Sequence, residues 1–170
     1  TQKKLSMNMA QNILRNMKYV CEGYHTKLLL KAVSNKDAAI LVAAGPSLNK
    51  NIQMLKKAKN RLFILAVDTA VKPLIKAGIK PDAFITIDAK KSPDLIKIDG
   101  AETIPVIAPP TAGYKIMERQ KAKKIFYYDG YFLPYSIYFI NDKVLPDVST
   151  GGSVACSGFS LLHKLGYETI

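Results

Sequence analysis

The stretch LFILAVDTAVKPLIKAGIKPDAFITID, residues 62–88, joins two short runs of apolar and β-branched residues through a segment of helical composition. The runs at 62–67 and 83–87 have the length and residue types of buried β-strands, and 69–77 is the helix between them. Strands connected by a helical crossover run parallel in one sheet. Residues 62–88 therefore predict the strand–helix–strand unit of an α/β fold.

The same alternation continues on both sides of this unit. Further strands are predicted at 39–43, 104–108 and 124–128, and further helices at 49–57 and 112–119. Such alternation is typical of a mostly parallel sheet whose two faces are both covered by helices. The predicted fold class is α/β, with a Rossmann-like arrangement.

An amphipathic helix is predicted ahead of the sheet. The opening segment carries apolar side chains at intervals of three to four residues, with polar residues between them. These apolar residues are Leu5, Met9, Ile13, Met17 and Val20. We therefore divide the chain into an N-terminal helical segment, 1–36, and a Rossmann-like domain, 37–170. Because the last residues, LGYETI, have the pattern of another strand entry, we expect this domain to be cut short at its C-terminal end.

Composition limits the class of protein. The chain has 170 residues, of which 48% are hydrophobic, and this suits one domain with a sizeable core. Its formal net charge is +12, but the lysines form no long basic run, which favours a solvated surface over a nucleic-acid groove. No apolar run reaches the roughly 20 residues that a membrane span requires. Cys21 and Cys156 match no metal-ligand spacing and are predicted to be buried reduced thiols, as in a cytoplasmic protein.

A glycine-containing corner follows the first predicted strand. Gly45, Pro46 and Ser47 stand where the strand at 39–43 ends and a helix begins. A helix that starts near Ser47 would direct free N–H groups and the positive end of its dipole at an anion, and glycine would leave room for the turn. No complete phosphate-binding motif is present. The corner is therefore either a phosphate site or an ordinary turn in which Ser47 caps the helix.

Two aspartates end the next two predicted strands. Asp68 and Asp88 each follow directly on a strand, and parallel sheets bind ligands beyond the carboxyl ends of their strands. With the corner at Gly45 they form a candidate site for ribose hydroxyls or for a magnesium ion that bridges phosphates. Each aspartate could instead cap the helical stretch that follows it. Asp82 enters a strand from the opposite edge and is predicted to be structural.

A second glycine-rich helix start lies near the end of the chain. Four small residues precede an apolar helix that begins near Val154, and these are Thr150, Gly151, Gly152 and Ser153. Their N–H groups and hydroxyls could close over the same anion. A glycine-rich segment ahead of a helix is also an ordinary connector.

Three stretches together resemble a known family. ILVAAGPSLNKNIQML, AVDTAVKPLIKAGIKPDAFITID and TGGSVACSGFSLLHKLGYETI resemble the central domain of the motility accessory factor proteins of flagellin glycosylation, which are grouped with 6-hydroxymethylpterin diphosphokinase-like proteins. The resemblance covers nearly all of 38–170. That domain is similar in turn to bacterial sialyltransferases that use CMP-sugars.

The resemblance implies where a nucleotide would bind. It implies that the corner lies against the donor's phosphate and ribose, that the two aspartates surround the nucleotide, and that the second glycine-rich segment covers its other side. In residue numbers, these are Gly45, Pro46 and Ser47, then Asp68 and Asp88, then Thr150, Gly151, Gly152 and Ser153.

The function implied by the resemblance is nucleotide-sugar binding, with a CMP-nonulosonic acid as donor, in a flagellin-type protein glycosyltransferase. A protein acceptor such as flagellin is implied, and no cofactor is expected to be required. Catalytic residues stay unassigned, because the sialyltransferases carry their histidine after the strand that here begins at Thr169. The alternatives are a pterin diphosphokinase-like enzyme that uses ATP with magnesium held by Asp68 and Asp88, and a non-catalytic interaction module.

Overall fold

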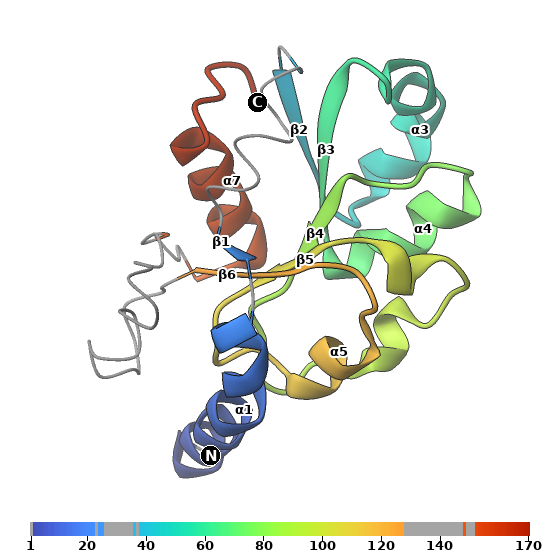
Figure 1. Cartoon of the computed structure of the whole chain (residues 1–170). Helices are drawn as coiled ribbons and strands as arrows, with labels where there is room; N and C mark the ends of the chain where they lie inside the picture. The colour runs from blue at the N-terminus through green and yellow to red at the C-terminus, as the bar shows by residue number, and fades with distance from the viewer. Residues whose placement is uncertain (1, 23, 26–35, 37, 128–147, 149–151) are drawn as a thin grey trace.

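A parallel sheet forms the centre of the computed structural model (Figure 1), which describes residues 2–22, 24–25, 36, 38–127, 148 and 152–170. The strand order is β1-β6-β5-β4-β3-β2, and every neighbouring pair is parallel. The strands are β1 Tyr24–His25, β2 Ala38–Val42, β3 Leu62–Val67, β4 Ala83–Ile85, β5 Val106–Ala108 and β6 Lys124–Phe126. The α/β, Rossmann-like fold predicted from the alternation is confirmed.

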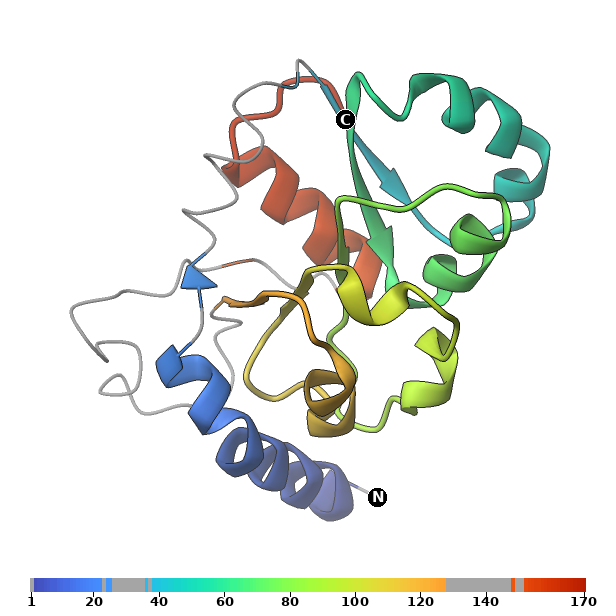
Figure 2. The same cartoon turned by 45° about the vertical axis from the view of Figure 1, so that its right-hand side comes forward.

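Helices cover both faces of this sheet. They are α1 Gln2–Glu22, α3 Pro46–Ala58, α4 Val71–Lys76, α5 Tyr114–Arg119 and α7 Val154–Lys164, with short 3₁₀ turns η1 Asp68–Ala70, η2 Pro93–Ile96 and η3 Ala101–Thr103. Figure 2 shows α3 and α4 on one side of β2 and β3, and α7 on the other side. The order of the strands explains this arrangement, because successive right-handed crossovers from β2 to β6 place their helices on one face.

Helix α7 approaches the sheet closely at one glycine. A Cβ atom at Gly158 would lie 2.7 Å from Cδ1 of Leu41 and 3.6 Å from Cγ2 of Ile85. Leu41 belongs to β2 and Ile85 to β4, so the helix crosses β3 with its backbone almost against the side chains of the sheet. Glycine therefore allows this packing distance.

Several element boundaries differ from the sequence predictions. The helix expected from residue 49 begins at Pro46, since proline suits the first position of a helix, where no N–H is needed. The helix expected at 69–77 is divided into η1 and α4. Strand β4 ends at Ile85 and β5 begins at Val106, so both are shorter than their apolar runs.

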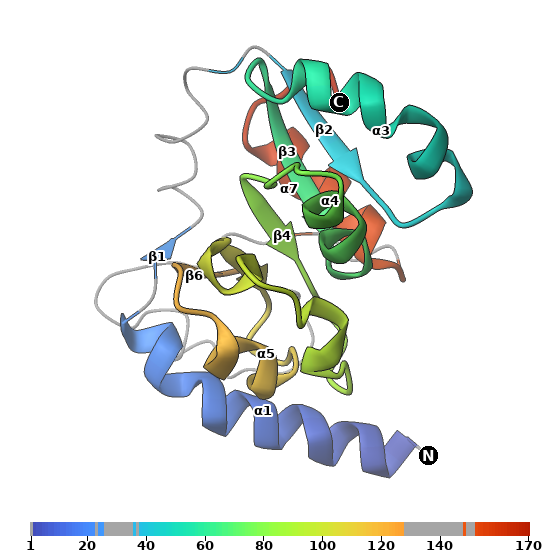
Figure 3. The ribbon, with the colours of Figure 1, turned by 90° about the vertical axis from the view of Figure 1, so that its right-hand side faces the viewer.

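Helix α1 is attached to the sheet through two asparagines. Asn12 and Asn16 are 3% and 0% exposed and lie one turn apart on the same face. The side-chain amide of Asn12 donates to the carbonyls of Ala89 and Thr111, and that of Asn16 donates to the carbonyls of Pro110 and Ala112. The predicted apolar residues of α1 are only half-buried. Figure 3 shows α1 running across α5.

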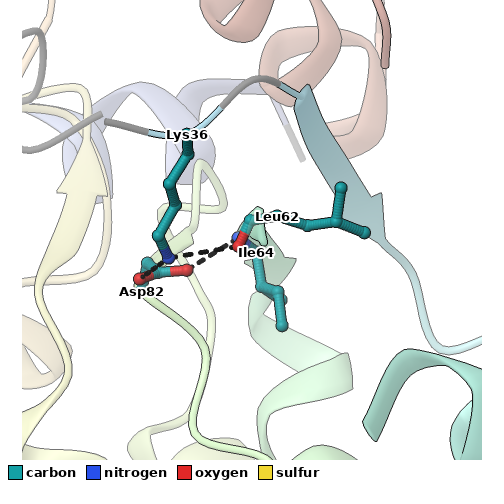
Figure 4. A network of polar contacts seen from close by, with 4 residues as sticks. All are labelled: Lys36, Leu62, Ile64 and Asp82. Atoms are coloured by element: carbon teal, nitrogen blue, oxygen red, sulfur yellow. Dashed lines mark hydrogen bonds and ion pairs between the residues drawn. The ribbon is translucent and has the colours of Figure 1, made fainter. Parts of the chain in front are cut away.

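The amino edge of the sheet is held by Asp82, as predicted. Its Oδ1 lies 2.6 Å from Nζ of Lys36, and its Oδ2 accepts a hydrogen bond of 2.8 Å from the backbone N–H of Ile64 (Figure 4). Lys36 also donates to the carbonyl of Leu62. The network joins the start of β3 to the entries of β2 and β4, so Asp82 has a structural role.

Two other sequence expectations are tested by the described residues. No helix among them is long and apolar enough to cross a membrane. Both cysteines are free, but the prediction that they are buried is wrong for Cys156, which is exposed, and Cys21 is half-buried. Cys156 lies in the first turn of α7.

The burial of Tyr167 predicts that the free energy of unfolding falls at alkaline pH. Its ring stacks on Phe63, and its buried hydroxyl has no hydrogen-bond partner among the described residues. Burial, and then the negative charge of Asp82, raise the pKa of Tyr167 to about 12, against about 10 in an unfolded chain. The folded state therefore keeps a proton that the unfolded state loses, so the stabilisation is full below about pH 10 and is lost as the pH rises towards 12.

We expect Tyr167→Phe to remove this pH dependence. Urea unfolding at pH 8 and at pH 11 should show a smaller fall in the free energy of unfolding for Tyr167→Phe than for the wild type. At pH 8 the variant should be at least as stable, because it buries no unpaired hydroxyl. Equal falls in the two proteins would contradict the assignment.

Candidate functional site

The carboxyl end of β2 lies where the direction of strand addition reverses. From β2 to β6 each new strand is added on the same side of the last one. Helix α7 then crosses the opposite face and returns the chain to the free edge of β2, where the N–H of Ala39 donates to the carbonyl of Thr169 at 3.2 Å. Open α/β sheets bind ligands outside the carboxyl ends of the strands at such a switch point. The corner after β2 therefore occupies the favoured position in the fold.

The corner itself is an uncapped helix start. Gly45 is the N-cap residue of α3 and supplies no side-chain cap, and the first turn carries no acidic residue. Ser47 lies inside the first turn and is exposed, so the alternative that Ser47 caps the helix is wrong. The N–H groups of this turn thus have no side-chain acceptor at the cap position, while the positive end of the helix dipole faces outwards.

Gly45 has a backbone conformation that does not require glycine. Its φ is −90° and its ψ is 166°, an extended conformation that any residue can adopt. A Cβ atom there would meet only the Oγ of Ser47, at 3.7 Å, which is ordinary van der Waals contact. The expectation that glycine is needed to make the turn is therefore wrong. What glycine leaves here is free space above the start of α3.

Asp68 is buried in a network of protein donors. It is 1% exposed. Its Oδ1 accepts from the N–H of Thr69 at 2.7 Å, its Oδ2 accepts from the hydroxyl of Thr86 at 2.8 Å, and Nζ of Lys91 lies 3.2 Å from Oδ1. Both carboxylate oxygens are therefore engaged, and the side chain ties the end of β3 to the segment that follows β4.

Asp88 differs from Asp68 in being exposed. Its Oδ1 accepts from the N–H of Lys90 at 2.8 Å, which closes a tight turn. Its carbonyl accepts from the N–H of Gly113 at 3.2 Å, so this turn rests on the loop after β5. Asp88 therefore has one carboxylate oxygen without a protein donor among the described residues.

The second glycine-rich segment is described only in part. Thr150 and Gly151 lie outside the described residues. Gly152 has a φ of 79°, a left-handed conformation that favours glycine. Ser153 is the N-cap of α7, where its Oγ accepts from the N–H of Cys156 at 3.2 Å. Because α7 begins at the carboxyl edge of the sheet, Gly152 and Ser153 lie on the same edge as the corner at Gly45.

Metal binding is restricted by these contacts. Within the described part of the chain, no three acidic, histidine or cysteine side chains gather into a metal site. Asp68 would have to exchange protein donors for a metal ion, whereas Asp88 has one oxygen without a protein donor among the described residues. The roles of Thr86 and Lys91, which bind Asp68, were not predicted from the sequence. Their positions next to the end of the second strand, in ITIDAKK, could have indicated them.

Comparisons with known proteins found a matching family model and a similar protein. A family model described as 6-hydroxymethylpterin diphosphokinase MptE-like matches residues 11–170. An uncharacterized protein of Treponema pallidum (strain Nichols) is 35% identical over 78 residues, which cover 46% of this chain and 36% of that protein. The chain thus spans about a third of that relative's length.

A solved structure supports the fold. The chain is similar to the MAf glycosyltransferase of Magnetospirillum magneticum AMB-1, with a TM-score of 0.64 and 18% identity over 78% of this chain and 22% of that protein. At this identity the likeness concerns the fold alone. The family match and this structure confirm the resemblance to the MptE-like and motility accessory factor proteins.

Proposed function

This chain belongs to the 6-hydroxymethylpterin diphosphokinase MptE-like family, and from that premise we propose that it is the nucleotide-sugar-binding domain of a protein glycosyltransferase. The proposed donor is a CMP-nonulosonic acid, and the proposed acceptor is a hydroxyl group of a protein such as flagellin. The similarity in fold to a MAf glycosyltransferase supports the class of reaction. We propose a cytoplasmic location, where activated sugars are available.

One observation carries the proposal: an uncapped helix start at the switch point of the sheet. Gly45 leaves open space above the first turn of α3, and no side chain competes for its N–H groups at the cap position. A phosphate at this place would accept hydrogen bonds from backbone N–H groups and would face the positive end of the helix dipole. Pro46 and Ser47 would contact the phosphate and ribose.

The other residues have more limited proposed roles. Asp88 is exposed and would accept hydrogen bonds from ribose or base. Asp68 is buried, so in this proposal it supports the site through Thr86 and Lys91. Gly152 and Ser153 would cover the nucleotide from the start of α7, with Thr150 and Gly151 beside them. In this scheme binding needs no metal ion.

The second candidate is pterin diphosphate transfer from ATP with magnesium, which the description of the family model favours. In that reaction the metal neutralises charge on the phosphates. The free oxygen of Asp88 would be the ligand for the ion. The third candidate is a non-catalytic interaction module, which the experiment below would favour if neither nucleotide binds.

Calorimetry with CMP and with ATP separates these proposals. We expect CMP to bind in the presence of a chelator, and ATP to bind more weakly with or without magnesium. Asp88→Asn should keep CMP affinity within about threefold, because an amide retains an acceptor oxygen and removes repulsion with the phosphate. Asp99→Asn, also exposed, is the matched control for the change in charge.

The outcome that contradicts the CMP proposal is clear. A tenfold loss of CMP affinity, about 1.4 kcal/mol, on chelation or in Asp88→Asn alone would favour the magnesium-dependent enzyme. Tight binding of ATP that depends on magnesium would do the same. Binding of neither nucleotide would leave the interaction module.

A further inference from the structure

A basic cavity lies beside helix α1, and no residue of the corner at Gly45 lines it. It has a volume of about 370 Å³, which falls in the range of small-molecule sites. Its polar lining comes from α1, from the loop after β4 and from the start of α5, and includes Asn8, Gln11, Lys90, Lys91, Tyr114 and Lys115. None of the residues that we propose to contact the nucleotide lines it, although Lys91, the ion-pair partner of Asp68, does.

The walls of this cavity are fixed by Asn12. The side-chain amide of Asn12 donates to the carbonyl of Ala89 at 2.9 Å and to that of Thr111 at 2.8 Å, and its Oδ1 accepts from the N–H of Tyr114. One buried side chain thus connects α1 to the loop after β4 and to the loop after β5. The cavity is therefore preformed, which reduces the entropy that a ligand would lose in ordering it.

The lining carries positive charge without a matching carboxylate. Lys91 forms the ion pair with Asp68, whereas the ammonium groups of Lys90 and Lys115 form no ion pair with any residue that the structure describes. A further cation, the guanidinium of Arg15, lies 5.5 Å from the centre of the Tyr114 ring.

Two carboxylates lie near the cavity but do not line it. Asp88 accepts from the backbone N–H of Lys90, and Asp94 accepts from the hydroxyl of Ser92 at 2.9 Å. Both are exposed, so water screens their effect on an ion inside the cavity. The lysines of the lining therefore dominate its charge.

We propose that this cavity binds a small, multiply charged oxyanion, with phosphate or carboxylate groups. The ammonium groups of Lys90 and Lys115 would supply charge, and the side-chain amides of Asn8 and Gln11 would donate hydrogen bonds from α1. Such charge-assisted hydrogen bonds are stronger than neutral ones. The site shares none of its proposed ligand groups with the nucleotide site and would add a second anionic ligand to the carboxyl edge of the sheet.

A single isosteric substitution tests the proposal. Gln11 of α1 is exposed and lines the cavity. Gln11→Glu therefore places a carboxylate in the lining while the shape of the side chain stays nearly constant. We expect this variant to weaken the binding of inorganic pyrophosphate or of citrate, measured by calorimetry, by roughly tenfold or more. Gln53→Glu on α3 makes the same change in charge on an exposed helix face and should have no effect. The two anions distinguish a phosphate site from a carboxylate site.

A second pair of variants tests the lysines. Lys90→Gln with Lys115→Gln should abolish anion binding, whereas Lys57→Gln with Lys121→Gln, at exposed positions outside the cavity, should preserve it. CMP affinity should stay unchanged in Gln11→Glu, and this separates a failure here from a failure at the nucleotide site. The proposal is overturned if neither anion binds at millimolar concentration, or if the cavity variants and their controls lose affinity equally.

Discussion

We expect Asp68→Ala to lower the free energy of unfolding by about 3 kcal/mol, because it removes one partner of a buried ion pair and leaves the other groups of the network unpaired. The hydroxyl of Thr86 and the N–H of Thr69 would each lose an acceptor, and Lys91, whose side chain is 22% exposed, would lose its counter-ion. For a chain of this size, that loss corresponds to a melting temperature lower by roughly 6–12 °C. Thermal unfolding followed by circular dichroism measures it directly.

Control variants test whether this destabilisation is specific to Asp68 or follows the removal of any aspartate at the strand ends. Asp88→Ala should change the melting temperature little, because Asp88 is exposed and its Oδ1 accepts one local hydrogen bond. The double variant Asp68→Ala with Lys91→Met should be less destabilised than the sum of its single variants, since no unpaired charge remains. An Asp68→Ala protein as stable as the wild type would contradict the buried network.

This result also decides how binding data at the two aspartates are interpreted. If Asp68 stabilises the loop after β4, a loss of nucleotide affinity in an Asp68 variant reports a disturbed scaffold as readily as a lost ligand contact. Asp88 lies in the same edge of the sheet without such a network. Substitutions at Asp88 therefore give the cleaner test of ligand contact.

From Ala38 to Phe126 the order of strands and helices could be predicted from the sequence because it depends on local patterns, whereas strand β1 at Tyr24–His25 lies inside the segment that was predicted to be helical. Apolar runs of five or six residues alternate with helical segments in this part of the chain, and this alternation specifies parallel strands. The structural role of Asp82 was predictable for the same reason, since the turn at 77–82 sets the edge on which it lies.

The attachment of α1 could not be predicted, because it depends on contacts between residues that are distant in the sequence. The apolar periodicity of 5–20 indicated an amphipathic helix, but its most buried side chains are Asn12 and Asn16. The side-chain N–H groups of both asparagines donate to carbonyls nearly a hundred residues away, in the loop after β5, whereas the buried Oδ1 of Asn16 has no partner among the described residues. A sequence read locally assigns such residues to the solvated face.

The roles of the site residues were predictable only in part. Spacing placed the corner and both aspartates at strand ends, and the structure puts all of them at the carboxyl edge of the sheet. Whether an aspartate there is buried or exposed depends on its neighbours: Asp68 meets Thr86 and Lys91, and Asp88 meets solvent. The conformation of Gly45 likewise depends on how α3 packs, which no local pattern specifies.

Gly45→Val is expected to abolish CMP binding while the protein stays folded. A valine suits the extended φ and ψ of this position, and its Cβ would contact only the Oγ of Ser47 at 3.7 Å, so the melting temperature should change little. Its two methyl groups would fill the space above the first turn of α3, where the proposed phosphate approaches the backbone. We expect CMP affinity to fall at least 100-fold, about 2.7 kcal/mol.

The loss of CMP affinity should increase with the size of the side chain at position 45. Gly45→Ala adds one methyl group and should weaken CMP less than Gly45→Val, whereas Ala43→Val adds branched bulk two residues upstream, at an exposed position, and should leave the affinity within about threefold. Anion binding in the cavity beside α1 should be unaffected by all three, since Gly45 and Ala43 do not line it. Unchanged CMP affinity in a folded Gly45→Val protein would exclude the corner as the phosphate site, because no phosphate could then be lying against the backbone that the valine covers.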